Sequence, residues 1–272
     1  MITNFYDTRT SKLLLDWVKS GVINPAANPD GDMFSNENYK LWTVLGVALN
    51  IIQREAIRGK ETIYKIGKNF ASELKKVNAN VDMKYLHFPH ISILIEIPPG
   101  ILSHPETTSN SITAVVIIPS RDQTYLVCAM SADTEKINHF AIDPILHQFT
   151  EDFINQATRA WSLTGNVSQQ SITELLQFIC NVLMYLKSGN PDLREYRPKH
   201  KKSFKIKGKS YGAADKNDIF SILVGFDYKK PKLYSVDNTQ VSGHFRWQPY
   251  GEAYSKIKLI WIDSHIRTFK NY

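Results

Sequence analysis

Cysteine is scarce in this sequence, and so are long hydrophobic runs. Only Cys128 and Cys180 occur among the 272 residues, one in a strand-like stretch and one in a helix-like stretch, and this spacing matches no zinc site. We therefore expect two buried free thiols, with no metal and no cofactor. No run of about eighteen uncharged apolar residues is present, and the N-terminus lacks the basic and apolar segments of a signal peptide. The sequence thus predicts an intracellular protein without a membrane span.

The composition is that of a packed globular protein, but its charge is unevenly spread. Hydrophobic residues make up 43% of the chain, and the formal net charge is +7. Residues 194–272 contain 17 Lys and Arg against 7 acids, whereas residues 1–193 contain 16 against 19. We predict a mixed helix and antiparallel-sheet core over 1–193 and a basic C-terminal lobe with a β-hairpin over 194–272. Such asymmetry favours a polyanionic partner, most often nucleic acid, over a merely solvated basic surface.

Hydrophobic periodicity predicts an α+β fold. Three helices are expected at the N-terminal side: one carrying Leu13, Leu14, Trp17 and Val18, one from about Asn36 to Arg58, and one from Glu61 to Lys76. The alternating segments HFPHISILIEIPPG, ITAVVIIP and TYLVCAM then predict an antiparallel β-meander over residues 87–130. Two further helices are expected, one from Asp143 to Ser162 and one from Ser171 to Leu186. IFSILVGF, residues 219–226, is typical of a buried strand.

A basic segment follows these helices. REYRPKHKKSFKIKGKSYG holds eight Lys and Arg and one acid, interleaved with Tyr196, Phe204 and Tyr211. Cations mixed with aromatic rings suit a segment that follows a phosphate backbone. The candidate nucleic-acid-binding residues here are Arg194, Arg197, Lys199, Lys201, Lys202, Lys205, Lys207 and Lys209.

The stretch from Val236 to Arg267 predicts a β-hairpin. Val241, Gly243, Phe245 and Trp247 fall on one side of a period-two pattern, and Ser242, His244, Arg246 and Gln248 fall on the other. Residues 249–255 supply the turn, and 256–263 form a second strand that we expect to be buried. His244, Arg246 and Gln248 are suited to gripping phosphates or base edges. We expect this row and the basic segment to form one exposed surface.

The order of several short strings adds a family resemblance. The strings are NVLMYLKSGNPDL, the basic segment, VGF, GHFRW and a closing IWI, mainly within residues 176–267. In this order they resemble the type V-A anti-CRISPR family of phages and mobile elements. The resemblance implies a protein that lowers production of a CRISPR effector nuclease in the cytoplasm of the bacterial host, by engaging RNA, a ribosomal assembly or the nascent chain. It implies no catalytic residues, and the chain has Ser264 where the family pattern leads us to expect proline.

Two other functions stay open on the sequence. A metal-independent ribonuclease could use His244 as acid or base and Arg246 or Lys258 to stabilise charge, if His200, His265 or a carboxylate supplied the partner group. A peptide-recognition module could instead use the apolar side of the hairpin. Whether the chain is an enzyme is therefore undecided by its sequence.

Overall fold

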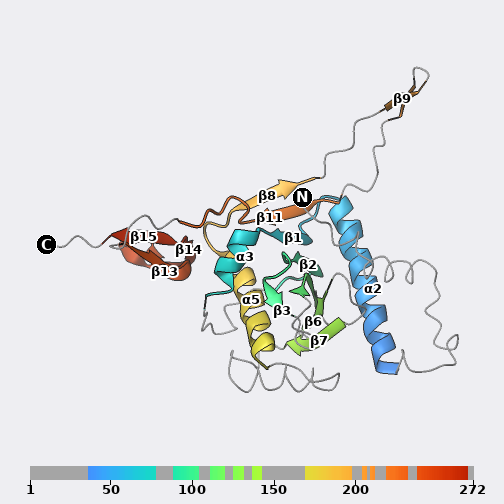
Figure 1. Ribbon diagram of the computed structural model, residues 1–272, viewed down its shortest axis with the longest axis horizontal. Coiled ribbons are helices and arrows are strands. Elements are labelled where there is room, and N and C mark those ends of the chain that lie inside the picture. Colours follow the sequence, from blue (N-terminus) through green and yellow to red (C-terminus); the bar gives the residue numbers. More distant parts are fainter. Residues whose placement is uncertain are drawn as a thin grey trace.

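A seven-stranded mixed β-sheet forms the centre of the fold (Figure 1). The computed structural model describes residues 36–77, 88–103, 111–119, 125–131, 137–142, 169–197, 204–206, 209–211, 219–231 and 238–268. The strands of the sheet are β1 Ile63–Ile66, β2 Ile93–Glu96, β5 Ala114–Pro119, β6 Tyr125–Met130, β7 Ile137–Ile142, β8 Leu193–Tyr196 and β11 Ser221–Val224. They lie in the order β7-β6-β5-β2-β1-β11-β8.

The sheet combines parallel and antiparallel pairings. β1 runs parallel to both of its neighbours, β2 and β11. The chain between β1 and β2 passes through helix α3, Lys68–Leu74, because parallel neighbours need a crossover connection. β5, β6 and β7 continue antiparallel from β2, and β8 pairs antiparallel with β11. A short ladder of β3, Leu102–Ser103, and β4, Ser111–Ile112, lies outside the sheet.

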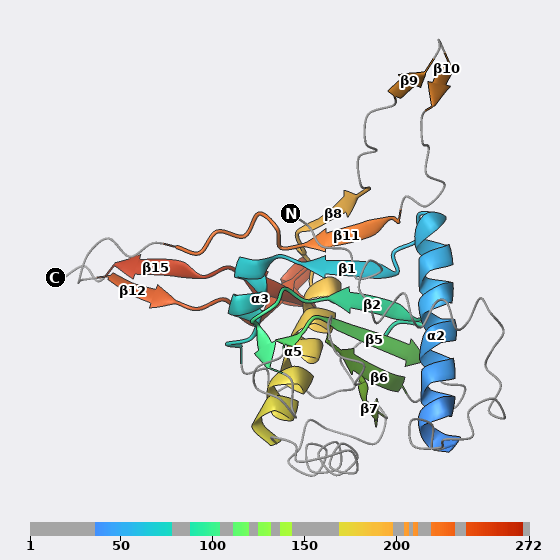
Figure 2. The same cartoon turned by 45° about the vertical axis from the view of Figure 1, so that its right-hand side comes forward.

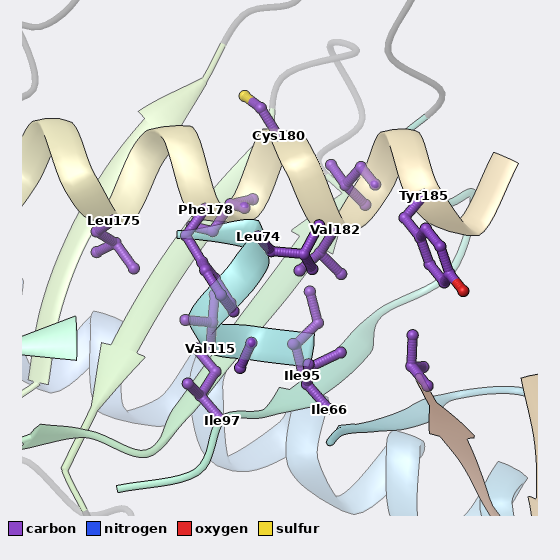
Figure 3. Packing of buried hydrophobic residues seen from close by; sticks show 14 of the residues in the cluster. Ile66, Leu74, Ile95, Ile97, Val115, Leu175, Phe178, Cys180, Val182 and Tyr185 are labelled. Atoms are coloured by element: carbon purple, nitrogen blue, oxygen red, sulfur yellow. The ribbon is translucent and has the colours of Figure 1, made fainter. Parts of the chain in front are cut away.

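Helices cover both faces of this sheet (Figure 2). α2, Asn36–Ile57, lies on one face, where Leu45, Leu49 and Ile52 pack against the strands. α3 and α5, Gln169–Lys187, lie on the other face and form the larger core with the strands (Figure 3). The central strands are buried on both sides, which explains their nearly continuous apolar sequences.

The structure confirms the predicted fold class and several elements. The meander is present as β2, β5 and β6, IFSILVGF contains β11, and α2 and α5 lie where helices are predicted. Cys128 and Cys180 are buried free thiols. The helices predicted at Leu13–Val18 and Asp143–Ser162 lie outside the described residues.

The helix predicted from Glu61 to Lys76 is wrong in its first half. Residues 63–66 form β1, and the helical part is Lys68–Leu74. Ile63 and Ile66 have helical spacing, but a strand buried on both faces needs no alternation, so the spacing of its apolar residues is uninformative. The parallel pairing around β1 was missed for the same reason.

The C-terminal part of the chain contributes to the sheet and also extends beyond it. The predicted domain boundary at Arg194 falls within β8, and β11 lies between β8 and β1. β9, Phe204–Ile206, and β10, Lys209–Tyr211, pair with each other beyond the end of β8 (Figures 1 and 2). The division into two domains concerns independent folding and stays a prediction.

Four strands follow β11. They are β12 Asn238–Val241, β13 His244–Tyr250, β14 Lys256–Ile262 and β15 His265–Thr268. β12 pairs with β15, and β13 pairs with β14, both antiparallel. The predicted hairpin is thus present, with a short 3-10 turn at Glu252–Tyr254 between β13 and β14.

Candidate functional site

The four C-terminal strands form one long antiparallel ribbon. Val241 pairs with His265, and His244 pairs with Ile262. Residues 242–243 on one side and 263–264 on the other separate these two pairs. Because the two gaps have equal length, the β12–β15 ladder and the β13–β14 ladder are in the same register. We call residues 238–268 the terminal ribbon. Its pairing is interrupted at residues 242–243 and 263–264.

The terminal ribbon is anchored to the core at this interruption by a group of aromatic rings. Trp261 is 3% exposed, and its ring centroid lies 5.0 Å from that of Phe245 and 5.5 Å from that of Phe70. The ring centroids of Tyr185 and Tyr228 lie 4.4 Å and 5.6 Å from that of Phe70. These five residues form the aromatic cluster, which joins α3, α5, the segment that follows β11 and the ribbon. Buried rings in tilted contact contribute both area and specific geometry to such an anchor.

Two glycines make room for the cluster. A Cβ on Gly243 would lie 2.9 Å from Cη2 of Trp261 and nearer still to Cζ2. Gly225 has a φ of +61°, and a Cβ there would lie 2.7 Å from Cβ of Phe70 and closer to its ring. A side chain at either position would have to displace a buried aromatic ring. The glycines of the GHFRW and VGF strings therefore have a packing role.

Hydrogen bonds fix the polar groups around the cluster. The Gly243 N–H donates to Oε1 of Glu73 at 2.8 Å, and Glu73, in α3, is 1% exposed. Trp261 Nε1 donates to Oδ1 of Asp263 at 2.7 Å. The Tyr228 and Ser264 hydroxyls are hydrogen-bonded to each other, a contact that a proline in place of Ser264 could not make. Burial raises the pKa of the Tyr228 phenol.

The outer edge of β14 is covered by the turn that follows α5. The Gly189 N–H donates to the Leu259 carbonyl at 2.8 Å. Asn190 donates from Nδ2 to the Trp261 carbonyl and accepts from the Trp261 N–H, each at 3.1 Å. Tyr185 precedes this turn, and its hydroxyl accepts the Asp192 N–H at 2.8 Å. The SGNPD part of the long string thus closes a strand edge that would otherwise be open to pairing.

Beyond the anchor, the β13–β14 hairpin has two different faces. Cross-strand register places Gln248 opposite Lys258 and Tyr250 opposite Lys256, and residues opposite each other share a face. Arg246 and His244 continue this face along β13. We define the basic face by its exposed side chains His244, Arg246, Gln248, Lys256 and Lys258. Arg246, Lys256 and Lys258 take part in no ion pair in the part of the chain that the structure describes.

The opposite face is apolar and only half covered. Phe245, Leu259 and Trp261 pack on the core, whereas Trp247 is 49% and Ile257 65% exposed. The prediction that residues 256–263 form a buried strand is therefore wrong for the first part of β14. The hairpin extends past the core that covers its base.

The arginines of the basic segment have partners within the protein. Arg194 forms ion pairs with Asp192 at 3.4 Å and with Asp227. The Arg197 guanidinium lies 5.4 Å from the centroid of the Phe220 ring. For Lys205 in β9 and Lys209 in β10 the structure describes the strand position alone. Lys199, Lys201, Lys202 and Lys207 lie outside the described residues.

Where the structure describes the basic segment, it does not bring the segment to the basic face. Tyr196, where the chain leaves β8, pairs with Ser221, and Leu193 at the other end of β8 pairs with Val224. The basic segment leaves the sheet at the Tyr196 end of β8, whereas the ribbon is anchored near the Leu193 end, beside Gly225. In Figure 1, β9 accordingly lies well away from β13 and β14. Within the described residues, the β9–β10 ladder and the basic face therefore lie apart.

The histidines of the ribbon have no catalytic partner among the described residues. His244 Nδ1 is hydrogen-bonded to the Ser242 carbonyl at 3.0 Å, and His265 Nδ1 to the Asp263 carbonyl at 3.2 Å. Each contact is local, and within the described ranges neither ring reaches a carboxylate or a second imidazole. No cluster of three potential metal ligands occurs there either. No helix in those ranges has the length and apolarity needed to cross a bilayer.

Comparison with protein families matches residues 64–264 to the anti-CRISPR type V subtype A2 family, described as AcrVA2-like. The chain belongs to this family. Comparisons with curated proteins and with solved structures gave no match. The family match extends from β1 to the last residue before β15, so it covers the sheet, α5 and the anchored part of the terminal ribbon.

Apart from the basic segment, the strings that resemble the anti-CRISPR family meet at one place in the structure. NVLMYLKSGNPDL supplies Tyr185 and the turn on β14, and VGF supplies Gly225. GHFRW and IWI supply Gly243, Phe245 and Trp261, whereas Phe70 and Tyr228 of the aromatic cluster lie outside the strings. The sequence indicated the strings but not the residues outside them that join them, Phe70, Glu73 and Tyr228. The predicted site also left out Lys256, although hairpin register relative to Tyr250 could have indicated it.

Proposed function

We propose that this anti-CRISPR family member lowers production of a type V-A effector nuclease by binding RNA, or an assembly that contains RNA, through its basic face. The observation that carries the proposal is the set of three exposed cations, Arg246, Lys256 and Lys258, on a rigidly anchored hairpin. Family membership supports counter-defence, and the basic face supports the mode of action. The proposed place of action is the cytoplasm of the bacterial host.

The basic face has the chemistry that RNA binding requires. An exposed guanidinium donates two parallel hydrogen bonds to a phosphate, and exposed ammonium groups release counterions when they neutralise phosphates. Three phosphate contacts on a single strand would give a log–log salt slope of roughly −2. Arg194 is less suited to this role because two carboxylates already neutralise it. The lysines of residues 199–209 remain candidate contacts.

The apolar face supports a second candidate, recognition of a peptide such as the nascent nuclease. Trp247 and Ile257 leave an exposed apolar surface beside a cation-rich one. Large rings that are half exposed are typical anchors of protein interfaces. Binding to that face would depend weakly on salt and strongly on Trp247.

Coexpression of the chain with a tagged type V-A nuclease tests the proposal. We expect the wild-type chain to reduce the amount of nuclease, and a variant with Arg246→Gln, Lys256→Gln and Lys258→Gln to lose most of this effect. The substitutions are at exposed positions, so each should change the free energy of unfolding by less than about 0.5 kcal/mol. A matched variant with Lys229→Gln and Lys230→Gln, both exposed and off the ribbon, should behave like wild type.

The contrary results are distinct. Unchanged nuclease amounts together with inhibition of the purified nuclease would exclude action on production. Full activity of the triple variant would exclude the basic face. Retained activity of the triple variant with loss in Trp247→Ala would favour the peptide candidate.

A further inference from the structure

The turn of the β13–β14 hairpin holds an exposed tyrosine in an unfavourable backbone conformation. Ala253 and Tyr254 have φ values of 50° and 56°, the left-handed region that residues other than glycine seldom adopt. They are the non-glycine residues with positive φ in the described part of the chain. The Tyr254 N–H donates to the Gly251 carbonyl at 3.2 Å, which helps to hold this conformation. Tyr254 is 77% exposed at the tip, and such strain is often kept at functional positions.

A second exposed ring lies beside the cations of the basic face. Tyr250 is 42% exposed and pairs across the hairpin with Lys256. The Lys258 ammonium lies 5.4 Å from the centroid of the Tyr250 ring, within the range of a cation–π contact. Arg246 lies further along the same face. Tyr250, Lys256 and Lys258 therefore share the tip end of this face, and Arg246 extends the face toward the anchor.

We infer that this tip is a stacking platform for unpaired RNA bases. Tyr254 and Tyr250 would stack against bases, while Arg246, Lys256 and Lys258 would contact the phosphates between them. This inference rests on the proposed function and specifies single-stranded RNA as its ligand. Planar rings stack on any base, so the platform would bind single strands with little sequence preference.

The charges of the tip define the path of the strand. Glu252 is the acidic residue of the turn, and its carboxylate repels phosphate. The phosphates would therefore follow β13 and β14, and the bases would point toward the turn. A duplex would bind more weakly, because its bases are already paired and stacked inside the helix.

Fluorescence anisotropy of the full chain with a labelled single-stranded oligouridylate tests the inference. We expect Tyr254→Ala to weaken binding roughly 5- to 100-fold, as loss of one base-stacking contact does, and Tyr254→Phe to bind like wild type because the ring remains. The salt slope should be unchanged in Tyr254→Ala, since no phosphate contact is lost, and should become shallower in Lys256→Gln. Phe226→Ala, an exposed ring off the ribbon, is the matched control and should bind like wild type.

The outcomes separate this inference from the proposed function. Wild-type affinity in Tyr254→Ala, or tighter binding of duplex than of oligouridylate, would overturn the stacking platform and leave RNA binding by the basic face intact. Absence of oligouridylate and duplex binding by the wild-type chain at low salt would overturn both.

Discussion

Replacing Gly243 with alanine tests the anchor of the terminal ribbon. In an unstrained site, Gly→Ala stabilises a protein by about 0.4–1 kcal/mol through the unfolded chain. Here the added methyl would lie 2.9 Å from Cη2 of Trp261 and nearer to Cζ2, well inside an ordinary carbon contact. The Trp261 indole cannot move away freely, because it is buried and its Nε1–H is hydrogen-bonded to Asp263. Overpacking of this kind costs about 1–3 kcal/mol, so we expect net destabilisation of about 1–2 kcal/mol.

Urea unfolding followed by far-UV circular dichroism measures this change. Gly189→Ala is the matched control, because its methyl would lie 3.5 Å from Cδ of Lys258 and 3.6 Å from Cγ2 of Ile260, ordinary contact distances. We expect the control to be neutral or slightly stabilised. Trp261→Phe removes both crowded ring atoms, so adding it to Gly243→Ala should cost less than the two single changes together predict. Stabilisation by Gly243→Ala, or strict additivity with Trp261→Phe, would refute the packing argument.

Three further predictions concern the core. Glu96→Gln removes the carboxylate that lies 2.5 Å from the buried ammonium of Lys65. The free energy of unfolding, measured by urea titration, should fall by about 3–5 kcal/mol. A decrease below about 1 kcal/mol, as expected for an exposed ion pair, would contradict this. Burial raises the pKa of Cys128 and of Cys180 to about 12, so both thiols should resist iodoacetamide at pH 8 until urea unfolds the chain; rapid labelling of the native protein would show otherwise. Burial also raises the pKa of Tyr185 to about 12, above its value in the unfolded chain, so its contribution to stability should be complete below pH 10 and decline from pH 10 to 12, and a pH-independent unfolding midpoint over that range would exclude it.

Elements with a clear period or a clear boundary could be predicted from the sequence. The meander and α5 have regular apolar spacing, and the hairpin alternates polar and apolar residues on both sides of its turn. β1 could not be recognised because IYKI is too short to show a period, and a strand buried on both faces gives none. The burial of β14 was overestimated because its apolar residues continue beyond the core that covers Trp261.

The candidate site required long-range information. The sequence places the basic segment shortly before the hairpin, which suggests one surface. The antiparallel pairing of β8 with β11 instead separates them, since the segment leaves beside Ser221 and the ribbon is anchored beside Gly225. The partners of Arg194 and the contact of Glu73 with Gly243 likewise join residues whose proximity only the folded chain establishes.

Amide hydrogen exchange of the full chain, with and without single-stranded oligouridylate, is the most direct test of RNA binding by the β13–β14 hairpin. We expect slower exchange in peptides covering residues 244–262 when RNA is present, and no change in β2 and β5. Slower exchange confined to residues 194–211, or no change at the hairpin under conditions where RNA is bound, would contradict it.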